Sequence, residues 1–286
     1  MRKPILGLAL AMAIATPALA DEPAAPPKDV TVTGSVTLIS DYRFRGVSQS
    51  DNAPAIQGGI TVSHKSGFYA GMWASNLAGW GQFGGANMEL DLIGGYTKTI
   101  GNATVDVGLT WYMYPAGSDI TDFGEPYVKV SGTMGPVKLL AGVAYAPPQQ
   151  ALGQWYNTGA SNATGIPDRP NAKADNLYLW GDVSGGVPGL PVTLKAHIGY
   201  SKGNAGLGPN GTSVTPTGKY WDWLIGADIA VYGPLTAGIA YVDTDISTAG
   251  SAYLQPNFSQ QRNRSPNGDG KSIAGSKVLV SLTAAF

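Results

Sequence analysis

The chain has 286 residues, a formal net charge of −1 and no cysteine. The lack of cysteine excludes a disulfide scaffold and a thiolate metal site, and the near-zero charge gives no reason to expect nucleic acid as a partner. Charged residues make up 13% of the chain, against about 25% in an ordinary globular protein. Together with a mean hydropathy of −0.02, this fits a β-barrel with one apolar and one wet face, but it does not exclude a secreted β-sandwich.

Residues 1–20 have the three-part layout of a secretory signal peptide. Arg2 and Lys3 precede an apolar run that ends in a small-residue cleavage site at Ala18–Ala20. The alternative is a membrane anchor, but a spanning helix needs about 20 apolar residues and the run is shorter. We therefore expect cleavage after Ala20, a Pro/Ala-rich periplasmic lead-in at residues 21–30 and a single barrel domain at residues 31–286.

The first strand is predicted at Val30–Gly46, where apolar and polar residues alternate with a period of two. Side chains of a β-strand point alternately to opposite faces, so this strand has one apolar and one polar side. It is longer than the usual strand of about 5–6 residues. Tyr42 and Phe44 end the apolar side, where a lipid-facing strand would meet the headgroups. The pattern predicts a strand that crosses a membrane.

Eleven further stretches show strand patterns of the same kind, although Met72 and Trp73 leave the faces of the third strand ambiguous. In chain order the predicted strands are Ala55–His64, Phe68–Leu77, Met88–Lys98, Ala103–Tyr114, Glu125–Met134, Val137–Tyr145, Asp175–Ser184, Val192–Tyr200, Lys219–Tyr232, Leu235–Asp243 and Gly275–Phe286.

The connections alternate between long and short, which is the asymmetry of outer-membrane barrels with short periplasmic turns and longer outer loops. We expect an all-β, transmembrane, antiparallel up-and-down β-barrel of about twelve strands, with both chain ends on the periplasmic side. From Pro115 onward nearly every proline falls in a predicted loop or turn, and Pro126 stands near a strand start.

The competing fold is a two-sheet β-sandwich that buries the same apolar faces, and alternation alone does not separate the two. Aromatic residues on the apolar parity favour the barrel, because they fit girdles at two membrane interfaces. These residues are Tyr96, Trp111, Trp221, Trp223 and Tyr241.

A resemblance to a known family points the same way. The stretches SDYRFRGVSQSDNAPAIQGG at Ser40–Gly59 and GFYAGMWASN at Gly67–Asn76 resemble the TorF-type porin family of Gram-negative bacteria. The terminal Phe286, preceded by apolar residues at every second position, resembles the C-terminal signal read by the barrel-assembly machinery. The resemblance implies an outer-membrane barrel and a pore, and it assigns no substrate and no catalytic residue.

Charged residues concentrate on the parity that we predict to face the lumen. Lysine or arginine on the lipid side would cost about 2–4 kcal/mol at the midplane, which supports this face assignment. The mixed signs predict a polar lumen crossed by ion pairs, without strong cation or anion selectivity. The predicted lumen residues are Asp41, Arg43, Arg45, Glu89, Asp91, Asp106, Glu125, Lys129, Lys138, Asp182, Lys195, His197, Asp222, Asp228 and Lys277.

Arg43 and Arg45 allow two interpretations. They could attract anionic solutes at a constriction, or they could be structural arginines bridged to carboxylates such as Glu89 or Asp91, and we favour the structural interpretation. No metal site is expected, because the chain has two histidines and no cysteine. No cofactor and no catalytic residue are expected either.

Three functions follow, in decreasing order of support. The first is a porin-like channel in the bacterial outer membrane for passive diffusion of small polar solutes or ions. The second is a non-conducting structural or recognition barrel, whose outer loops at residues 146–174 and 244–274 would bind a partner. The third is a lipid-acting enzyme, disfavoured because His64 and His197 are poorly placed for a lipid substrate and no G-x-S-x-G elbow occurs. The sequence leaves open whether the lumen is plugged and whether the chain forms a homo-oligomer.

Overall fold

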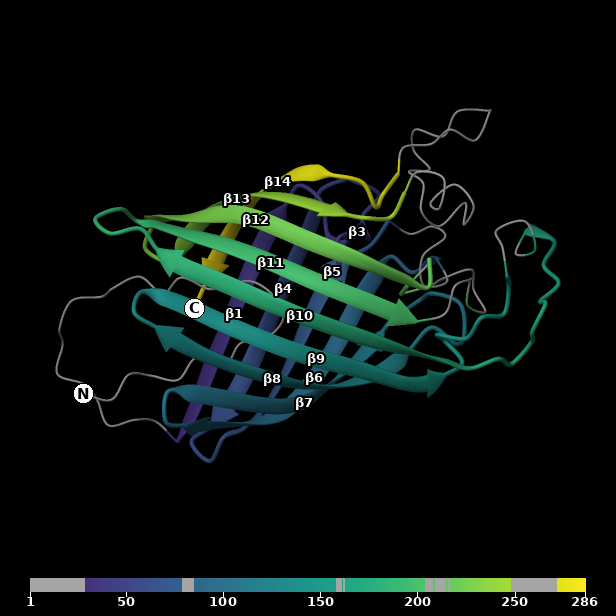
Figure 1. Ribbon diagram of the computed structural model, residues 1–286, viewed down its shortest axis with the longest axis horizontal. Helices are drawn as coiled ribbons and strands as arrows, with labels where there is room; N and C mark the ends of the chain where they lie inside the picture. The colour runs from purple at the N-terminus through teal and green to yellow at the C-terminus, as the bar shows by residue number, and fades with distance from the viewer. Residues whose placement is uncertain are drawn as a thin grey trace.

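Twelve antiparallel strands form a closed barrel in the computed structural model of the chain (Figure 1). The structure describes residues 29–78, 85–157, 161, 163–203, 208, 214–215, 217–247 and 272–286. The predicted signal peptide and most of the lead-in lie outside the described residues and stay predictions. The predicted closed, antiparallel, twelve-stranded fold is confirmed.

Each strand pairs with its neighbours in the barrel order, and a separate two-stranded hairpin, β2–β3, follows β1. The barrel strands are β1 (Val30–Ile39), β4 (Ala55–His64), β5 (Phe68–Asn76), β6 (Met88–Ile100), β7 (Ala103–Met113), β8 (Phe123–Met134), β9 (Val137–Gln149), β10 (Ala174–Gly186), β11 (Val192–Gly203), β12 (Lys219–Tyr232), β13 (Leu235–Thr244) and β14 (Lys277–Ala285), and the hairpin is β2 (Arg43–Phe44) and β3 (Val47–Ser48).

The first and last strands close the sheet. β1 pairs with β14 in a register that sets Thr37 opposite Thr283, and their hydroxyl oxygens are 2.9 Å apart. The backbones of Gly34 and Phe286 exchange two further hydrogen bonds beyond the end of β14. A closed sheet leaves no edge of unpaired backbone groups.

The faces of the strands decide between the barrel and the sandwich. Val107, Leu194 and Val280 lie in the middle of their strands and are 49%, 55% and 54% exposed, so no second sheet covers them. The polar residues of the other parity are turned inward, and many are buried, such as Asp106, Thr110 and Asp228. The apolar side is therefore the outside of the barrel, and the sandwich interpretation is wrong.

The connections between strands are short at one end of the barrel and long at the other (Figure 1). Two-residue turns join β6 to β7, β8 to β9 and β12 to β13, whereas long segments join the strands at the other end. We call these the short-turn end and the long-loop end. The C-terminus lies at the short-turn end, as predicted. Among the described residues, no helix is long and apolar enough to span a membrane.

Inward-facing aromatic rings lie against glycines of neighbouring strands. A Cβ atom on Gly142 would come within 2.3 Å of the Trp180 ring, and one on Gly108 would come within 2.5 Å of the Tyr127 hydroxyl. Trp73 also points inward and packs on Tyr42, which settles the ambiguous third strand with Met72 outside. These rings occupy the space that the missing side chains leave, and they hold adjacent strands in register.

The first strand is shorter than predicted. It ends at Ile39, and the chain then turns into the barrel, so the predicted strand over residues 40–46 is wrong. Tyr42 is 5% exposed inside the barrel and does not stand at the end of a lipid-facing strand. The alternation of residues 40–46 persists because the segment forms a hairpin, which has the same period as a strand.

Two prolines depart from the loop prediction, because Pro147 and Pro148 lie in the last residues of β9, at the long-loop end. Pro126 lies near the start of a strand, as predicted: it is paired in β8 opposite Leu109 and faces outward. Proline donates no hydrogen bond to the ladder, so such positions suit strand ends and irregular pairing.

Barrel closure can be tested with an engineered disulfide, because the chain has no cysteine of its own. We expect Thr37→Cys with Thr283→Cys to form a disulfide on mild oxidation of the folded protein, because these residues are partners in the register of β1 and β14. Thr37→Cys with Leu282→Cys is the matched control, since Leu282 points to the opposite face of β14. Non-reducing gels report both pairs, and equal cross-linking in the two would contradict the register.

The aromatic–glycine contacts predict a difference between two neighbouring glycines. We expect Gly142→Val to lower the free energy of unfolding by about 1–3 kcal/mol, because the new side chain overlaps the Trp180 ring. Gly181→Val is the control, because a Cβ atom there would meet only a carbonyl oxygen at 3.7 Å. Urea unfolding of the refolded variants measures the difference, and equal stability would show that the ring moves aside freely.

Candidate functional site: the barrel lumen and its inward loop

A segment between β1 and β4, residues 40–54, folds into the barrel at the long-loop end, and we call it the inward loop. Its β2–β3 hairpin turns at Arg45 and Gly46, whose φ angles are +48° and +79°. Positive φ at both central residues is the pattern of a type I′ turn, the preferred two-residue hairpin connection. A Cβ atom on Gly46 would lie 2.4 Å from Thr244 on β13, so glycine also allows the tip to lie close against this strand.

The base of the inward loop is held by a buried ion pair. The Arg43 Nε donates to the Asp41 carboxylate at 2.7 Å, and Asp41 is fully buried. The same guanidinium donates to the backbone carbonyls of Gly46, Ile273 and Gly275, each at 2.9 Å. Arg43 therefore ties the loop to the segment that precedes β14.

The tip of the inward loop is held by a second ion pair on the opposite wall. Arg45 donates to both oxygens of Glu125 on β8, at 2.7 and 2.6 Å, and its guanidinium lies 4.1 Å from the centre of the Tyr178 ring on β10. Burial would lower the pKa of Arg45, but the Glu125 carboxylate outweighs it and raises that pKa, so the guanidinium stays charged. The hairpin thus spans the lumen from β1 to β8 and β10.

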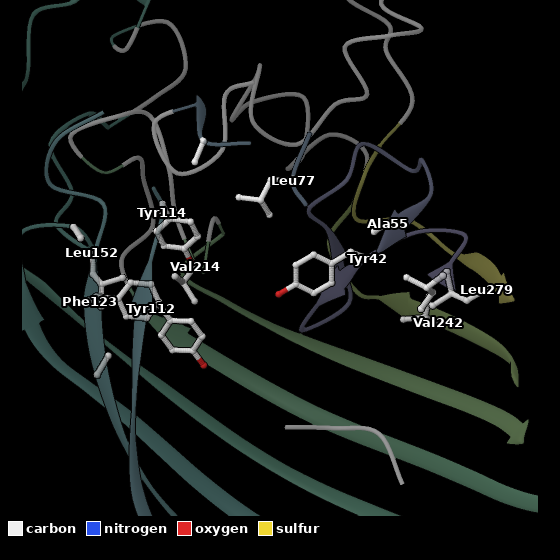
Figure 2. Packing of buried hydrophobic residues seen from close by; sticks show 14 residues of the cluster. Tyr42, Ala55, Leu77, Tyr112, Tyr114, Phe123, Leu152, Val214, Val242 and Leu279 are labelled. Atoms are coloured by element: carbon white, nitrogen blue, oxygen red, sulfur yellow. The ribbon is translucent and has the colours of Figure 1, made fainter. Parts of the chain in front are cut away.

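Buried apolar side chains fill the long-loop half of the lumen around this hairpin (Figure 2). Tyr42 packs on Trp73 with ring centroids 5.3 Å apart, and Tyr112 stacks on Phe123 at 4.6 Å. We call this group the lumen cluster. Its members are Ile39, Tyr42, Ala55, Leu77, Ala86, Tyr112, Tyr114, Phe123, Ala146, Ala151, Leu152, Val214, Val242 and Leu279.

A polar contact joins the lumen cluster to the barrel wall. The Tyr42 hydroxyl donates to Glu89 on β6 at 2.9 Å. Burial and the neighbouring carboxylates of Glu89 and Asp91 raise the pKa of Tyr42 well above its ordinary value, so this hydroxyl keeps its proton and remains the donor.

Ion pairs also line the inner wall of the barrel away from the inward loop. Lys129 lies 2.9 Å from Asp106, and Lys195 lies 2.7 Å from Asp228. Both pairs join neighbouring strands, β7 with β8 and β11 with β12, and they do not line up charges of one sign along the lumen.

A histidine organises the polar wall of β10–β12. The His197 Nδ1 lies 2.6 Å from Asp182, and its Nε2 lies 2.8 Å from the Tyr178 hydroxyl and 3.2 Å from Asp222. Tyr178 also carries the Arg45 guanidinium on its ring. The tip of the inward loop and the histidine are therefore parts of one network.

The structure places the predicted lumen residues on the inner side, but on different elements. Asp41, Arg43 and Arg45 belong to the inward loop and not to a barrel strand. Lys138 follows the start of β9 at the short-turn end and is exposed, and Lys277 begins β14 at the long-loop end. The role of all these residues in a pore stays a prediction.

Sequence reasoning placed Tyr42 and Phe44 on the wrong side, because it continued the strand through them. The Phe44 ring packs edge-on against Tyr112 with centroids 5.8 Å apart, inside the barrel. The Arg45-Gly46 dipeptide was a signal for a turn, although it is weaker than the Asn-Gly pair that marks most type I′ hairpins. The partner of Arg45 is Glu125 and not Glu89 or Asp91.

Comparison with known proteins places the chain in a family. Residues 21–267 match the model of the family described as "Bacterial protein of unknown function (Gcw_chp)". The chain belongs to this family. No curated protein matches the chain.

Solved structures of porins are similar to this Gcw_chp family member at low sequence identity. The chain is similar to the NanC porin, with 13% identity, a TM-score of 0.51, and coverage of 90% of this chain and 99% of that one. An anion-selective porin from Comamonas acidovorans matches with 10% identity, a TM-score of 0.41, and coverage of 90% and 99%. The likeness to the NanC porin supports the barrel fold alone.

The ion pair at the loop tip predicts that removing one partner lowers the stability of the protein more than removing both charges. We expect Arg45→Met to lower the free energy of unfolding by about 3–5 kcal/mol, because it leaves the buried Glu125 carboxylate without its cation. Adding Glu125→Gln should recover much of this loss, since the double variant buries no lone charge. Urea unfolding of the single and double variants tests this, and a double variant no more stable than Arg45→Met would contradict the pairing.

Proposed function

We propose that this protein is a porin-like channel in the bacterial outer membrane for passive diffusion of small polar solutes or ions. The observation that carries the proposal is the division of the closed sheet into an apolar outer face and a charged inner face. A barrel in water gains nothing by exposing Val107, Leu194 and Val280, whereas in a bilayer these side chains contact lipid and the polar residues line the interior.

Aromatic residues on the outer face support the membrane setting. Trp111, Tyr145, Trp221 and Tyr241 are exposed near the long-loop end, and Phe68, Tyr96, Tyr232 and Phe286 are exposed near the short-turn end. Two such bands are typical of barrels whose aromatic girdles lie at the two interfaces. In this orientation the short turns are periplasmic and the long loops face outward.

Charged residues follow the same division. On the outward parity of the described strands, Lys98, Lys202 and Asp243 stand within the last residues of their strands. At these depths the cost of a charge falls to about 0–1 kcal/mol. The central band of the barrel is left to apolar side chains.

The inward loop is the feature that would set the width of the channel. It spans the lumen at its outward-facing half, and the lumen cluster packs around it. Twelve strands lie between the eight-stranded barrels that side chains fill and the open porins of 16–18 strands. A loop that narrows the lumen therefore limits passage to small solutes.

The lumen cluster also favours a second function, a non-conducting barrel that acts through its outer loops. Buried side chains such as Tyr112, Phe123 and Leu152 would keep such a barrel closed. The channel remains the better supported function, because the solved structure whose fold the chain shares is a porin, NanC.

We propose no enzymatic function. The ring nitrogens of His197 contact Asp182, Asp222 and Tyr178, and none of these is a serine. His64 lies 2.8 Å from Ser66, but both are exposed in a tight turn. A nucleophilic serine needs a histidine that is itself oriented by a third group.

The remaining predictions belong to this proposal. They are membership of the TorF-type porins, secretion by the signal peptide, assembly through Phe286, contact with outer-membrane lipid, and formation of a homo-oligomer. The Phe286 ring is 73% exposed in the closed barrel, and its backbone pairs with that of Gly34.

Single-channel recording of the wild-type protein and of a variant with a shortened inward loop tests the proposed channel. Gln49 donates a backbone hydrogen bond to Tyr42 at 2.8 Å, so a two-residue Asn-Gly turn can replace residues 43–48. We expect stepwise conductance from the wild-type protein in planar bilayers and larger steps from the shortened variant. A variant with the Asn-Gly turn and the same steps as wild type would show that the loop does not set the width. No steps from either protein would favour the recognition barrel.

A further inference from the structure

Two aromatic rings of β10 lie flat on the inner wall of the barrel. Trp180 leans over Gly142 on β9, and the three atoms nearest to a Cβ atom placed there all belong to the Trp180 ring. Tyr178 leans the other way, over Gly199 on β11. The two ring planes are inclined by 18° to each other, with centroids 5.4 Å apart. The rings therefore lie side by side on the wall and not one on top of the other.

The face of the Trp180 ring that is turned away from the wall points into the lumen. The inward loop shows this for the neighbouring ring, because the Arg45 guanidinium covers the lumen face of Tyr178 at 4.1 Å. Trp180 lies nearly parallel to Tyr178, stands two residues nearer to the short-turn end, and is half-buried. Its lumen face is an aromatic platform next to the loop tip.

Water reaches the wall beside this platform. Asp182 and His197 are cross-strand partners on the inner face, and their side chains are 30% and 18% exposed. Lys195, one inward position nearer to the short-turn end, has a side chain that is 17% exposed. The ion pair at the base of the inward loop, by contrast, is 4% exposed or less. A solute can therefore reach the platform from the short-turn side of the inward loop.

The side chains around the platform offer hydrogen bonds of both kinds. Lys195 donates to Asp228 at 2.7 Å, so this pair carries no net charge. Asp182 contacts His197 through one oxygen at 2.6 Å, and its exposed surface can accept hydrogen bonds from a solute. Lys138 on β9 is exposed nearer to the short-turn end and adds a donor of the opposite charge to Asp182. The group as a whole thus favours a polar solute over an ion of either sign.

We infer that Trp180 and Asp182 form a binding site for the ring of an uncharged sugar in the lumen. The inference rests on the proposed channel function and names a class of solute for it. A pyranose ring has an apolar face of C–H groups and carries hydroxyl groups around its rim. The C–H face suits the negative face of an aromatic ring, and the hydroxyl groups suit Asp182 and Lys195. An inorganic ion has no apolar face for the platform to contact.

The test is binding of methyl β-D-glucopyranoside to the refolded mature chain in detergent micelles, followed by saturation transfer from protein to sugar protons in NMR. This measurement does not require a conducting pore. We expect transfer to the ring protons of this sugar and much less to sorbitol, an open-chain polyol without a fixed apolar face. Trp180→Leu should weaken binding about fivefold, which is the worth of one aromatic contact. Trp180→Phe should keep most of the binding, because it keeps an aromatic face.

The matched control is Trp111→Leu. The Trp111 ring also lies over a glycine, Gly124, but on the outer face of the barrel, where it is 41% exposed. We expect this variant to bind the sugar as the wild-type protein does. Equal binding of sorbitol and the glycoside would overturn the inference, as would a Trp180→Leu variant that binds like the control. Stronger binding of glucuronate than of the glycoside would overturn the uncharged class.

Planar-bilayer recording separates the site from the channel. Conductance without sugar binding would leave the channel in place and overturn the sugar site. Sugar binding without conductance would support the site and contradict the channel.

Discussion

The structure depends on one constraint, that every strand of the sheet has a neighbour on both sides. β1 and β14, the two ends of the chain's sheet, meet in an antiparallel pair that includes the contact between Thr37 and Thr283. Closure satisfies the backbone hydrogen bonds without help from solvent, which is what lets a sheet present an apolar face to hydrocarbon. The apolar outside, the charged inside and the sorting of loops by length are all consequences of this closure.

Closure also creates a lumen whose interior must be filled or hydrated. The wall contributes aromatic rings laid over glycines, as Trp180 lies over Gly142, together with ion pairs between neighbouring strands. The inward loop supplies what the wall does not, a hairpin that reaches from β1 to Glu125 and Tyr178. Buried charge and aromatic packing thus act together, since Arg45 is paired on one side and stacked on the other. The inward loop is therefore held in the lumen by an ion pair and by an aromatic ring at once.

Period-two alternation was enough to predict the barrel strands from β4 to β14, because lipid contact imposes that period on them. It also predicted their faces except in β5, where Met72 and Trp73 compete and only the packing of Trp73 on Tyr42 decides. The same rule failed at Tyr42 and Phe44, where a hairpin inside the barrel has the period of a strand that crosses the membrane. The partner of Arg45 could not be predicted, because Glu125 is 80 residues away in the chain and only barrel geometry sets them face to face.

The central claim is that the apolar face of the barrel contacts lipid while the other face is wet. Single cysteines at Val280, Ser281, Leu282 and Thr283 on β14, each carrying a fluorophore, can be examined in vesicles that contain lipids with a quencher on the acyl chain. The account predicts strong quenching at Val280 and Leu282 and weak quenching at Ser281 and Thr283. Equal quenching at all four positions, or the reverse alternation, would contradict it.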